Sequence, residues 1–219
     1  MPLAPPADVL TRTRIYRMVH VDCLDTLLAR DAIHAPSCVP QDDLRYVGIH
    51  AAQTQAHRGY VPVPCGPGGV IRDYVGFYLG PRSPMLLRIS TGRNVRRVDQ
   101  SQIVYLVSFA QEVENAGLGF VFTDRHSLAA VAEFRDRLAD LNIVDFQIAY
   151  AAYWSNTPDE PDRQEKKQAE FLVHRTMPWH LIHSIGVRNE QAARRVEAIL
   201  NVHPGRRRPA IAVRPLWYY

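Results

Sequence analysis

Cysteine is scarce in this chain of 219 residues. The only three, Cys23, Cys38 and Cys65, are widely spaced, odd in number and not arranged as CxxC. A disulfide framework and a cysteine-based zinc site are therefore not indicated, and we expect free thiols. The histidines show no metal-binding spacing such as HExxH, so we predict no metal.

Long apolar runs are missing as well. No run approaches the roughly 20 residues that a membrane-spanning helix needs, and the start, MPLAPPADVL, lacks the basic-then-apolar order of a secretion signal. Walker loops, GxGxxG after a strand, GxSxG elbows and zinc-deaminase motifs are also missing. We expect one globular domain over residues 1–219, in the cytoplasm and with no membrane partner.

Positive charge is in modest excess, with a formal net charge of +4. Nine of the cations fall in three clusters: Arg93, Arg96 and Arg97; Arg163, Lys166 and Lys167; and Arg206, Arg207 and Arg208. Such clusters attract polyanions such as nucleic acids. On charge alone they can equally serve only to keep a protein in solution, and the third cluster is typical of a solvated turn.

The first elements can be placed from pattern. Residues 14–20 (RIYRMVH) alternate as a strand that ends at His20. Asp22 is then expected to cap a helix over residues 23–30, with Asp25 completing a capping box. Residues 35–69 show little periodicity and many prolines, which is typical of a binding segment, and residues 50–57 within it favour a short helix ending near Arg58.

Later elements follow in an irregular order. DYVGFYLGPRSPMLLRIS, from Asp73, predicts a strand, a sharp break at Gly80 and Pro81, and a second apolar stretch. Further strands are expected at residues 103–107 (where the start of a helix is the alternative), 118–122, 171–173, 184–187 and 210–213. Helices are expected at residues 128–141 and 189–200. This mixture favours an α+β fold on a mixed, mainly antiparallel sheet.

Four segments, in the same order and spread over nearly the whole chain, resemble the DarT toxins: VHVDCLDTLL, DYVGFYLGPRSPML, YWSNTPDEPDRQEKKQAEFLV and PLWYY. The resemblance implies the ADP-ribosyltransferase fold, in which a split β-sheet forms a central NAD⁺ cleft flanked by helices. It also implies sequence-specific transfer of ADP-ribose from NAD⁺ to thymine bases in single-stranded DNA, with release of nicotinamide and a block to replication. The partner it implies is a DarG-like antitoxin with a macrodomain.

The same resemblance suggests roles for individual residues. Glu170 in QAEFLV matches the catalytic glutamate, and Arg58 in AHRGYVPV is the candidate for the catalytic arginine. The residues expected to bind the cofactor are His20, Asp22, Tyr78 and Arg82. Those expected to contact DNA are Met85, Arg93, Arg96, Arg163, Lys166 and Lys167, with Tyr153 and Trp154 available to stack on bases.

Chemistry makes these roles reasonable. Cleavage of NAD⁺ spreads positive charge over the ribose, which a fixed carboxylate such as Glu170 stabilises, and an arginine can stabilise the anion that forms on a thymine losing its N3 proton. From the residues alone, an exposed edge-strand glutamate is the better interpretation of Glu170, core packing is the better one for the two aromatics, and a solvated loop arginine explains Arg58 equally well. Transfer to another base in DNA or RNA, and a non-catalytic nucleic-acid-binding module, are the alternative functions.

Overall fold

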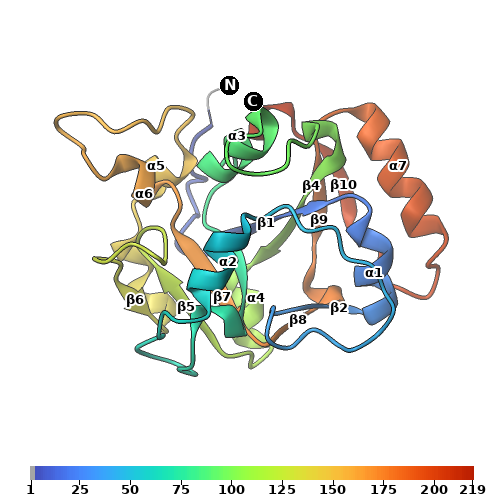
Figure 1. The fold of residues 1–219 in the computed structure, drawn as a ribbon, viewed down its shortest axis with the longest axis horizontal. Helices are drawn as coiled ribbons and strands as arrows, with labels where there is room; N and C mark the ends of the chain where they lie inside the picture. The colour runs from blue at the N-terminus through green and yellow to red at the C-terminus, as the bar shows by residue number, and fades with distance from the viewer. Residues whose placement is uncertain (1–2) are drawn as a thin grey trace.

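An eight-stranded sheet is the frame of the computed structural model, which describes residues 3–219 (Figure 1). The strand order is β10-β9-β4-β1-β3-β7-β5-β6, and every neighbouring pair is antiparallel except β9 with β10. The strands are β1 (Arg14–His20), β3 (Tyr74–Tyr78), β4 (Ile103–Phe109), β5 (Phe120–Thr123), β6 (Phe134–Arg135), β7 (Glu170–His174), β9 (Ser184–Val187) and β10 (Ala210–Val213). The predicted α+β fold on a mixed, mainly antiparallel sheet is confirmed.

Helices and a small second sheet surround this frame. The α-helices are α1 (Cys23–Arg30), α2 (Ala52–Arg58), α3 (Pro84–Thr91), α4 (Ala110–Asn115), α5 (Phe146–Tyr150), α6 (Arg163–Lys166) and α7 (Glu190–Asn201). Short 3₁₀ turns occupy Ile71–Asp73, Gln100–Gln102, Leu138–Ile143, Trp179–Leu181 and Pro215–Trp217. The second sheet pairs β2 (Ala32–His34) with β8 (Thr176–Pro178).

The large sheet is nearly divided between β1 and β3. These strands register at one residue pair, Tyr16 opposite Tyr78, whereas β1 pairs with β4 along its whole length. Where the two strands separate, the Arg17 guanidinium Nη1 donates to the Gly76 carbonyl oxygen at 2.7 Å. The sheet therefore consists of two halves, β10-β9-β4-β1 and β3-β7-β5-β6, joined at a narrow contact that leaves space beside it.

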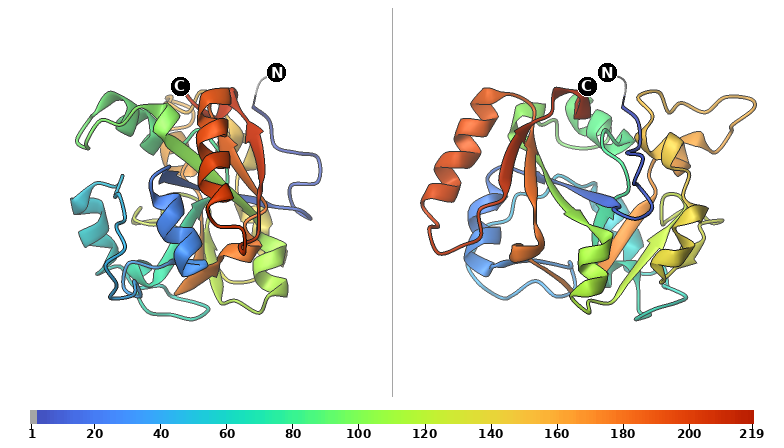
Figure 2. Two further views of the ribbon diagram at one scale, coloured as in Figure 1. Left: turned by 90° about the vertical axis from the view of Figure 1, so that its right-hand side faces the viewer. Right: turned by 180° about the vertical axis from the view of Figure 1, so that it is seen from behind.

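Both faces of the central strands are covered. Every residue of β4 is buried, which suits its sequence IVYLVSF, apolar except for Ser108. Helices α1 and α7 contact each other and pack against the β10-β9-β4-β1 half (Figure 2). Helix α7 buries Ala192, Val196 and Leu200, which recur every four residues, and the Asn189 side chain caps it by accepting from the Ala192 amide at 2.9 Å.

Most predicted elements are confirmed. Strand β1 and helix α1 lie where predicted, residues 103–107 belong to a strand rather than a helix, and α7 lies within a residue of the predicted helix at each end. The irregular segment 35–69 contains only α2 as a regular element. Helix α3 was not assigned from sequence; it begins with Pro84 at its first position, after the break at Gly80 and Pro81.

Two local predictions are wrong. Asp22 is the N-cap residue of α1, but no capping hydrogen bond forms, and the Asp25 carboxylate instead accepts from His203 Nε2 at 3.1 Å. The helix predicted at residues 128–141 is absent, because Phe134 pairs with Thr123 at the edge of the sheet and Val131 is 66 % exposed. The apolar residues at helical spacing in this segment belong instead to an edge strand and a surface loop.

Gly80 shows why the chain breaks after β3. A Cβ atom at this position would overlap the carbonyl group of Ala149, which belongs to α5. A Cβ at Gly48 would meet no atom within 4 Å. Only glycine therefore allows the bend after β3 to approach α5 closely.

We expect Gly80→Ala to lower the free energy of unfolding by about 1–3 kcal/mol or more, because backbone rather than a flexible side chain must move. Gly48→Ala is the matched control and should change stability by less than about 0.5 kcal/mol. Urea unfolding followed by tryptophan fluorescence measures both. Equal stabilities of the two variants would contradict the close approach.

Candidate active site

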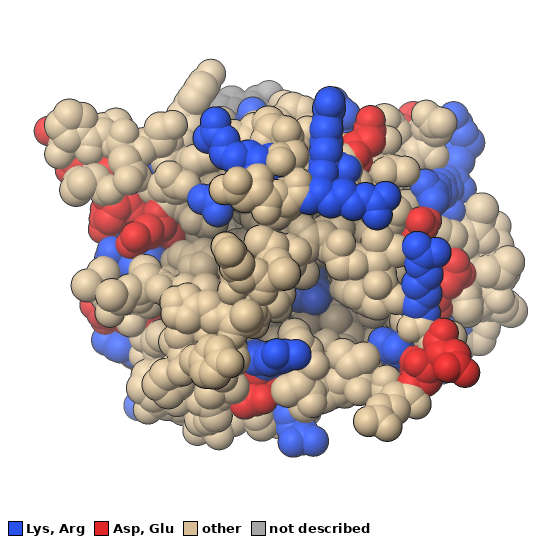
Figure 3. All heavy atoms as spheres, viewed as in Figure 1, with Lys and Arg blue, Asp and Glu red and all other residues tan. Residues whose placement is uncertain are grey.

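A cavity of about 280 Å³ opens where β1 and β3 separate. Its walls come from β1, β3, β7, α2, α3 and the segment that follows β2. Figure 3 shows a hollow near the middle of this face, with Lys and Arg side chains above it, over α3 and the segment after it. The residues that line the cavity include Arg17, Arg58, Gly76, Tyr78, His126 and Glu170.

Glu170 is the first residue of β7 and is only 3 % exposed. Its backbone is fixed from two sides, since it pairs with Tyr78 on β3 and its amide donates to Thr123 Oγ1 on β5 at 3.2 Å. The apolar residues that follow it are fully buried. The strand therefore holds the carboxylate at a fixed place in the cavity wall, not at an exposed edge.

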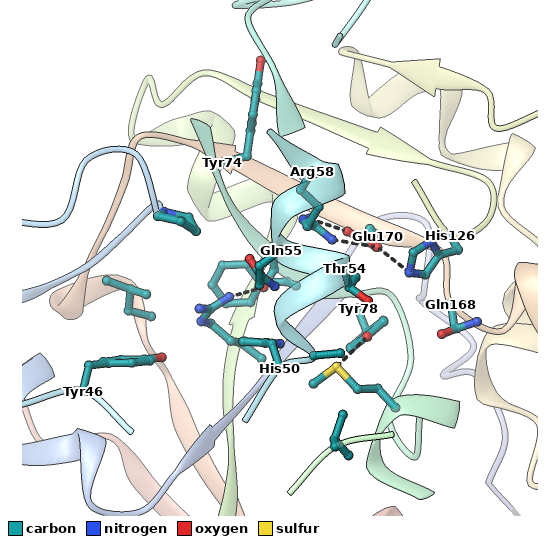
Figure 4. A pocket seen from close by; sticks show the side chains of 18 of the residues that line it. Tyr46, His50, Thr54, Gln55, Arg58, Tyr74, Tyr78, His126, Gln168 and Glu170 are labelled. Carbon is teal, nitrogen blue, oxygen red and sulfur yellow. Dashed lines mark hydrogen bonds and ion pairs between the residues drawn. The ribbon is translucent and has the colours of Figure 1, made fainter. Parts of the chain in front are cut away.

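Arg58, the last residue of α2, meets this carboxylate with both ends of its guanidinium. Nη2 lies 2.9 Å from Oε2 and Nη1 lies 3.3 Å from Oε1. Gly76 on β3 makes room for the pair, because a Cβ there would lie 3.2 Å from Arg58 Nη2. Arg58 and His126 approach Glu170 from opposite sides (Figure 4), with His126 Nε2 3.9 Å from Oε1.

The charges of this group are set by opposing effects. Burial raises the pKa of the Glu170 carboxyl, but Arg58 and His126 outweigh it, so the pKa is lowered from its ordinary value. Burial lowers the pKa of His126, with Glu170 acting in the opposite direction. At neutral pH the site thus holds an anionic carboxylate, a cationic guanidinium and a neutral imidazole.

Arg17 on β1 is a second positive group in this cavity. Burial, followed by the charges of Arg17 and Arg58, lowers the pKa of His50 to about 3. Arg17 lines the same cavity, and its Nε is buried without a hydrogen-bond partner in the described chain. A cavity lined by two guanidinium groups and an anionic carboxylate fits a dinucleotide that carries a diphosphate and a cationic ring.

Several predicted site residues meet in this cavity. Glu170, Arg58, Tyr78, Met85 and Arg93 all line it. His20 and Asp22 do not: His20 is 7 % exposed and its Nδ1 accepts from the Asp22 amide at 3.2 Å, while the Asp22 carboxylate pairs with Arg195. Contact of His20 and Asp22 with the cofactor stays a prediction.

Arg82 and Lys167 both contact other parts of the protein. The Arg82 guanidinium lies 4.6 Å from the centre of the Tyr219 ring, outside the cavity lining, and its contact with the cofactor stays a prediction. Lys167 is 1 % exposed, and its Nζ donates to the carbonyl oxygens of Pro81 at 2.9 Å and Ala149 at 2.6 Å. A side chain so buried and bonded cannot reach a DNA phosphate in this structure.

The remaining predicted DNA contacts differ in their surroundings. Arg163 pairs with Glu160, and Lys166 Nζ lies 3.0 Å from Asp162 Oδ2. Arg93 and Arg96 are exposed, and neither pairs with a carboxylate within residues 3–219. The cations of the third cluster contact their own surroundings: Arg206 pairs with Asp31 and Arg208 with Glu197.

The lining residues that sequence reasoning missed include Arg17, His50, Arg88 and His126. The only signal for His126 is its place three residues after β5, whose Phe122 pairs with Phe171 and so brings the end of β5 beside Glu170. No cluster of His, Cys, Asp or Glu that could hold a metal ion occurs in the described residues. Nor does the described chain contain a helix long and apolar enough to cross a membrane.

Comparisons with known proteins agree with this geometry. The family model described as "ssDNA thymidine ADP-ribosyltransferase, DarT" matches residues 16–219. A DNA ADP-ribosyl transferase of Thermus sp. (strain 2.9) is 42 % identical over 209 residues, covering 94 % of this chain and 96 % of the relative. The structure is similar to Thermus sp. 2.9 DarT in complex with ADP-ribosylated ssDNA, with a TM-score of 0.89, 39 % identity and full coverage of both chains. Thermus sp. 2.9 DarT in complex with NAD⁺ gives a TM-score of 0.83 at 39 % identity, covering 94 % of this chain and 98 % of that one.

The split sheet and its carboxylate-bearing cavity define an NAD⁺-dependent ADP-ribosyltransferase. The matched family then narrows this class to transfer onto DNA. The chain belongs to the DarT family of ssDNA thymidine ADP-ribosyltransferases.

The buried ammonium of Lys167 makes the stability of the protein depend on pH. Burial, followed by the charges of Arg82 and Arg163, lowers the pKa of its ammonium to about 7. The unfolded chain holds the same proton up to roughly pH 10.4. Between about pH 7 and 10 the unfolded state therefore binds more protons, and this residue makes the free energy of unfolding rise by up to about 1.4 kcal/mol per pH unit.

Lys167→Met should remove this rise, so the stability advantage of the wild type over the variant should grow between about pH 7 and 9. Lys166→Met is the control, because that ammonium lies at the surface against Asp162. Urea unfolding at several pH values measures both differences. A wild-type advantage that stays constant over this window would contradict the proposed burial of the ammonium.

Proposed function

We propose that this chain transfers ADP-ribose from NAD⁺ to thymine bases in single-stranded DNA, with Glu170 and Arg58 as its catalytic residues. The observation that carries the assignment of these residues is the buried Glu170–Arg58 pair in a cavity between the halves of the sheet. Membership of the DarT family supplies the reaction and the acceptor. NAD⁺ is the co-substrate.

Glu170 acts on the ribose of NAD⁺. The bond between the ribose anomeric carbon and nicotinamide breaks, the pair of electrons leaves with nicotinamide, and positive charge develops on the sugar ring. An anion held rigidly beside that ring stabilises this charge without having to reorganise. Glu170 is suited to this because β7 and Thr123 fix its backbone, and because its lowered pKa keeps it ionised.

Arg58 acts on the acceptor and on Glu170. The new bond forms between the anomeric carbon and N3 of thymine, and the N3 proton is released, so the products are ADP-ribosyl-thymidine, nicotinamide and a proton. A guanidinium stays charged throughout and therefore stabilises the developing anion on the base rather than removing its proton. Its two contacts with Glu170 also orient the carboxylate.

The surroundings of the cavity support the other partners. Arg17 and Arg58 offer charge for the NAD⁺ diphosphate, and the exposed Arg93 and Arg96 lie where a strand of DNA can approach the cavity from α3. Family membership further supports a toxin whose modified template blocks replication, acting in the cytoplasm, and a DarG-like antitoxin with a macrodomain that removes the modification.

The reaction is tested by incubating the protein with NAD⁺ and oligonucleotides of varied sequence, single- and double-stranded, DNA and RNA, and measuring product masses. Gain of one ADP-ribose on thymine-containing single-stranded DNA alone is expected. A gain in mass only on guanine or on RNA would show that the acceptor is not thymine. Binding without any gain in mass would show that the protein is a non-catalytic nucleic-acid-binding module.

We expect Glu170→Gln to lower the transfer rate by about 10²–10³-fold, the usual cost of one preorganised charge-stabilising group. Glu165→Gln is the matched control, because this exposed glutamate lies on α6 close in sequence but outside the cavity lining. The rate is measured by nicotinamide release in the presence of DNA. Full activity of Glu170→Gln in a folded protein would rule out the assignment.

Arg58→Gln tests the origin of the Glu170 charge. Without the guanidinium, the largest effect that lowers the pKa of this carboxyl is lost while burial remains, so the pKa should rise. The carboxylate works when ionised, so activity is present above this pKa and lost as pH falls through it. The acidic limb of kcat/KM, measured between about pH 4 and 8 at high enzyme concentration, should therefore move to higher pH.

Arg58→Lys is the matched control, because it keeps the charge but not the two-pronged contact. Its rate should fall while its acidic limb stays near that of the wild type. An unshifted limb in Arg58→Gln would show that Arg58 does not set the charge of Glu170.

A further inference from the structure

A second cavity, of about 500 Å³, lies beside the first. One wall belongs to α3 and the residues after it, and the other belongs to the segment between α5 and β7. The polar and aromatic residues of these walls are Arg88, Thr91 and Arg93 on the first, and Trp154, Ser155 and Gln164 on the second.

The two cavities are adjacent. Arg88, Arg93 and Asn94 line both of them. Arg88 is also close enough to the catalytic group to act on the pKa of His126. A ligand that extends beyond the first cavity on the α3 side therefore meets residues that also line the second.

Trp154 forms a fixed aromatic wall in this second cavity. Its indole Nε1 donates to the Tyr219 hydroxyl at 2.6 Å, and that hydroxyl donates in turn to the Arg82 carbonyl oxygen at 3.1 Å. The Arg82 guanidinium covers the Tyr219 ring. Arg82 thus helps to hold Tyr219, which in turn holds Trp154.

The backbone around Trp154 is held as well. Arg163 donates from Nε and Nη2 to the Tyr153 carbonyl oxygen, both at 3.2 Å. The Gln164 amide donates to Asn156 Oδ1 at 2.8 Å. An aromatic ring whose orientation and backbone are both fixed loses little entropy when a flat ligand stacks on it.

The opposite wall carries available positive charge. Arg88 and Arg93 are exposed, and in the described part of the chain neither forms an ion pair or a side-chain hydrogen bond, whereas Arg163 and Lys166 across the cavity are paired with carboxylates. Free cations on one side and an aromatic ring on the other are the two features that bind a nucleotide of a single strand, through its phosphate and its base.

We propose that the second cavity holds a nucleotide adjacent to the acceptor thymine, with its base stacked on Trp154 and its phosphate paired with Arg88 or Arg93. The proposal rests on the proposed function and extends it to the sequence context of the acceptor. The side chains of Gln164 and Ser155 carry donors and acceptors that can contact the edge of the stacked base. The preferred base at this neighbouring position is then set by these residues.

The test compares removal of the base next to the acceptor thymine with removal of the Trp154 ring. It uses an oligonucleotide that the wild type modifies at one thymine, and two copies with an abasic residue on the 5′ or the 3′ side of that thymine. For the wild type, one of the two abasic copies should show a kcat/KM lower by roughly 5- to 150-fold, the factor that corresponds to stacking of one base on an aromatic side chain. Trp154→Ala should show a similar loss on the intact oligonucleotide and no further loss on that abasic copy.

Trp154→Phe keeps a ring and should keep most of the coupling, which separates stacking from loss of structure. NAD⁺-induced thermal stabilisation should be equal in all three proteins, because Trp154 is outside the first cavity. If the abasic residue costs the same in Trp154→Ala as in the wild type on both sides, the base does not stack on Trp154. Failure of the proposed function looks different, since the wild type would then modify no thymine oligonucleotide.

The phosphate contact has its own measurement. Arg93→Gln should reduce the slope of log affinity for single-stranded DNA against log salt concentration by about 0.7, the value for one phosphate contact on a single strand. Arg88→Gln is the second variant of this pair. Arg194→Gln removes the same charge from the exposed face of α7 and should leave the slope near the wild-type value. Equal slopes in all three variants would overturn the phosphate contact.

Discussion

The contact between Glu170 and Arg58 is the constraint on which the site depends. A carboxylate that is 3 % exposed stays ionised only if neighbouring groups offset the loss of water, and the Arg58 guanidinium makes the largest such contribution, followed by His126. Removing one partner of such a buried pair usually costs about 3–5 kcal/mol, because the other charge is left uncompensated. The pair also joins α2, which buries none of its own residues, to the strand β7. The helix over the cavity is therefore positioned by the same charges that we propose for catalysis.

The split in the sheet supplies the space for that pair. Had β1 and β3 continued to pair beyond Tyr16 and Tyr78, their backbones would have closed the cavity. Gly76 contributes on the other side, because it leaves room for the guanidinium of Arg58 against β3. Strain and unsatisfied groups commonly gather at functional sites, and the unpartnered Nε of Arg17 lies at this gap.

Much of the fold could be read from the sequence, but the site could not be read without the family resemblance. Periodicity located α1 and α7, each of which buries one face, and the apolar alternation of residues 14–20 located β1, although most of its residues are buried. It misplaced a helix at residues 128–141, where apolar residues serve a short edge strand. His126 was out of reach, because its distance from Glu170 follows from the register of β5 against β7, which no local pattern records.

Lys167 shows most clearly that a cluster of cations in the sequence need not form a cluster of exposed cations in the structure. It follows Lys166 directly, yet Lys166 pairs at the surface with Asp162 while Lys167 is buried against two carbonyl oxygens. Neighbouring residues at a helix end point in different directions, so a cluster of cations divides by function. Here Lys167 binds the bend after β3 to α5, and Arg163 holds the backbone of the segment that carries Trp154. The arginines of the α3 wall form no ion pair in the described residues and are available to an anionic ligand. Whether a cation is paired, rather than how many cations lie close in the sequence, separates the side chains that stabilise the fold from those that are available to bind an anionic ligand.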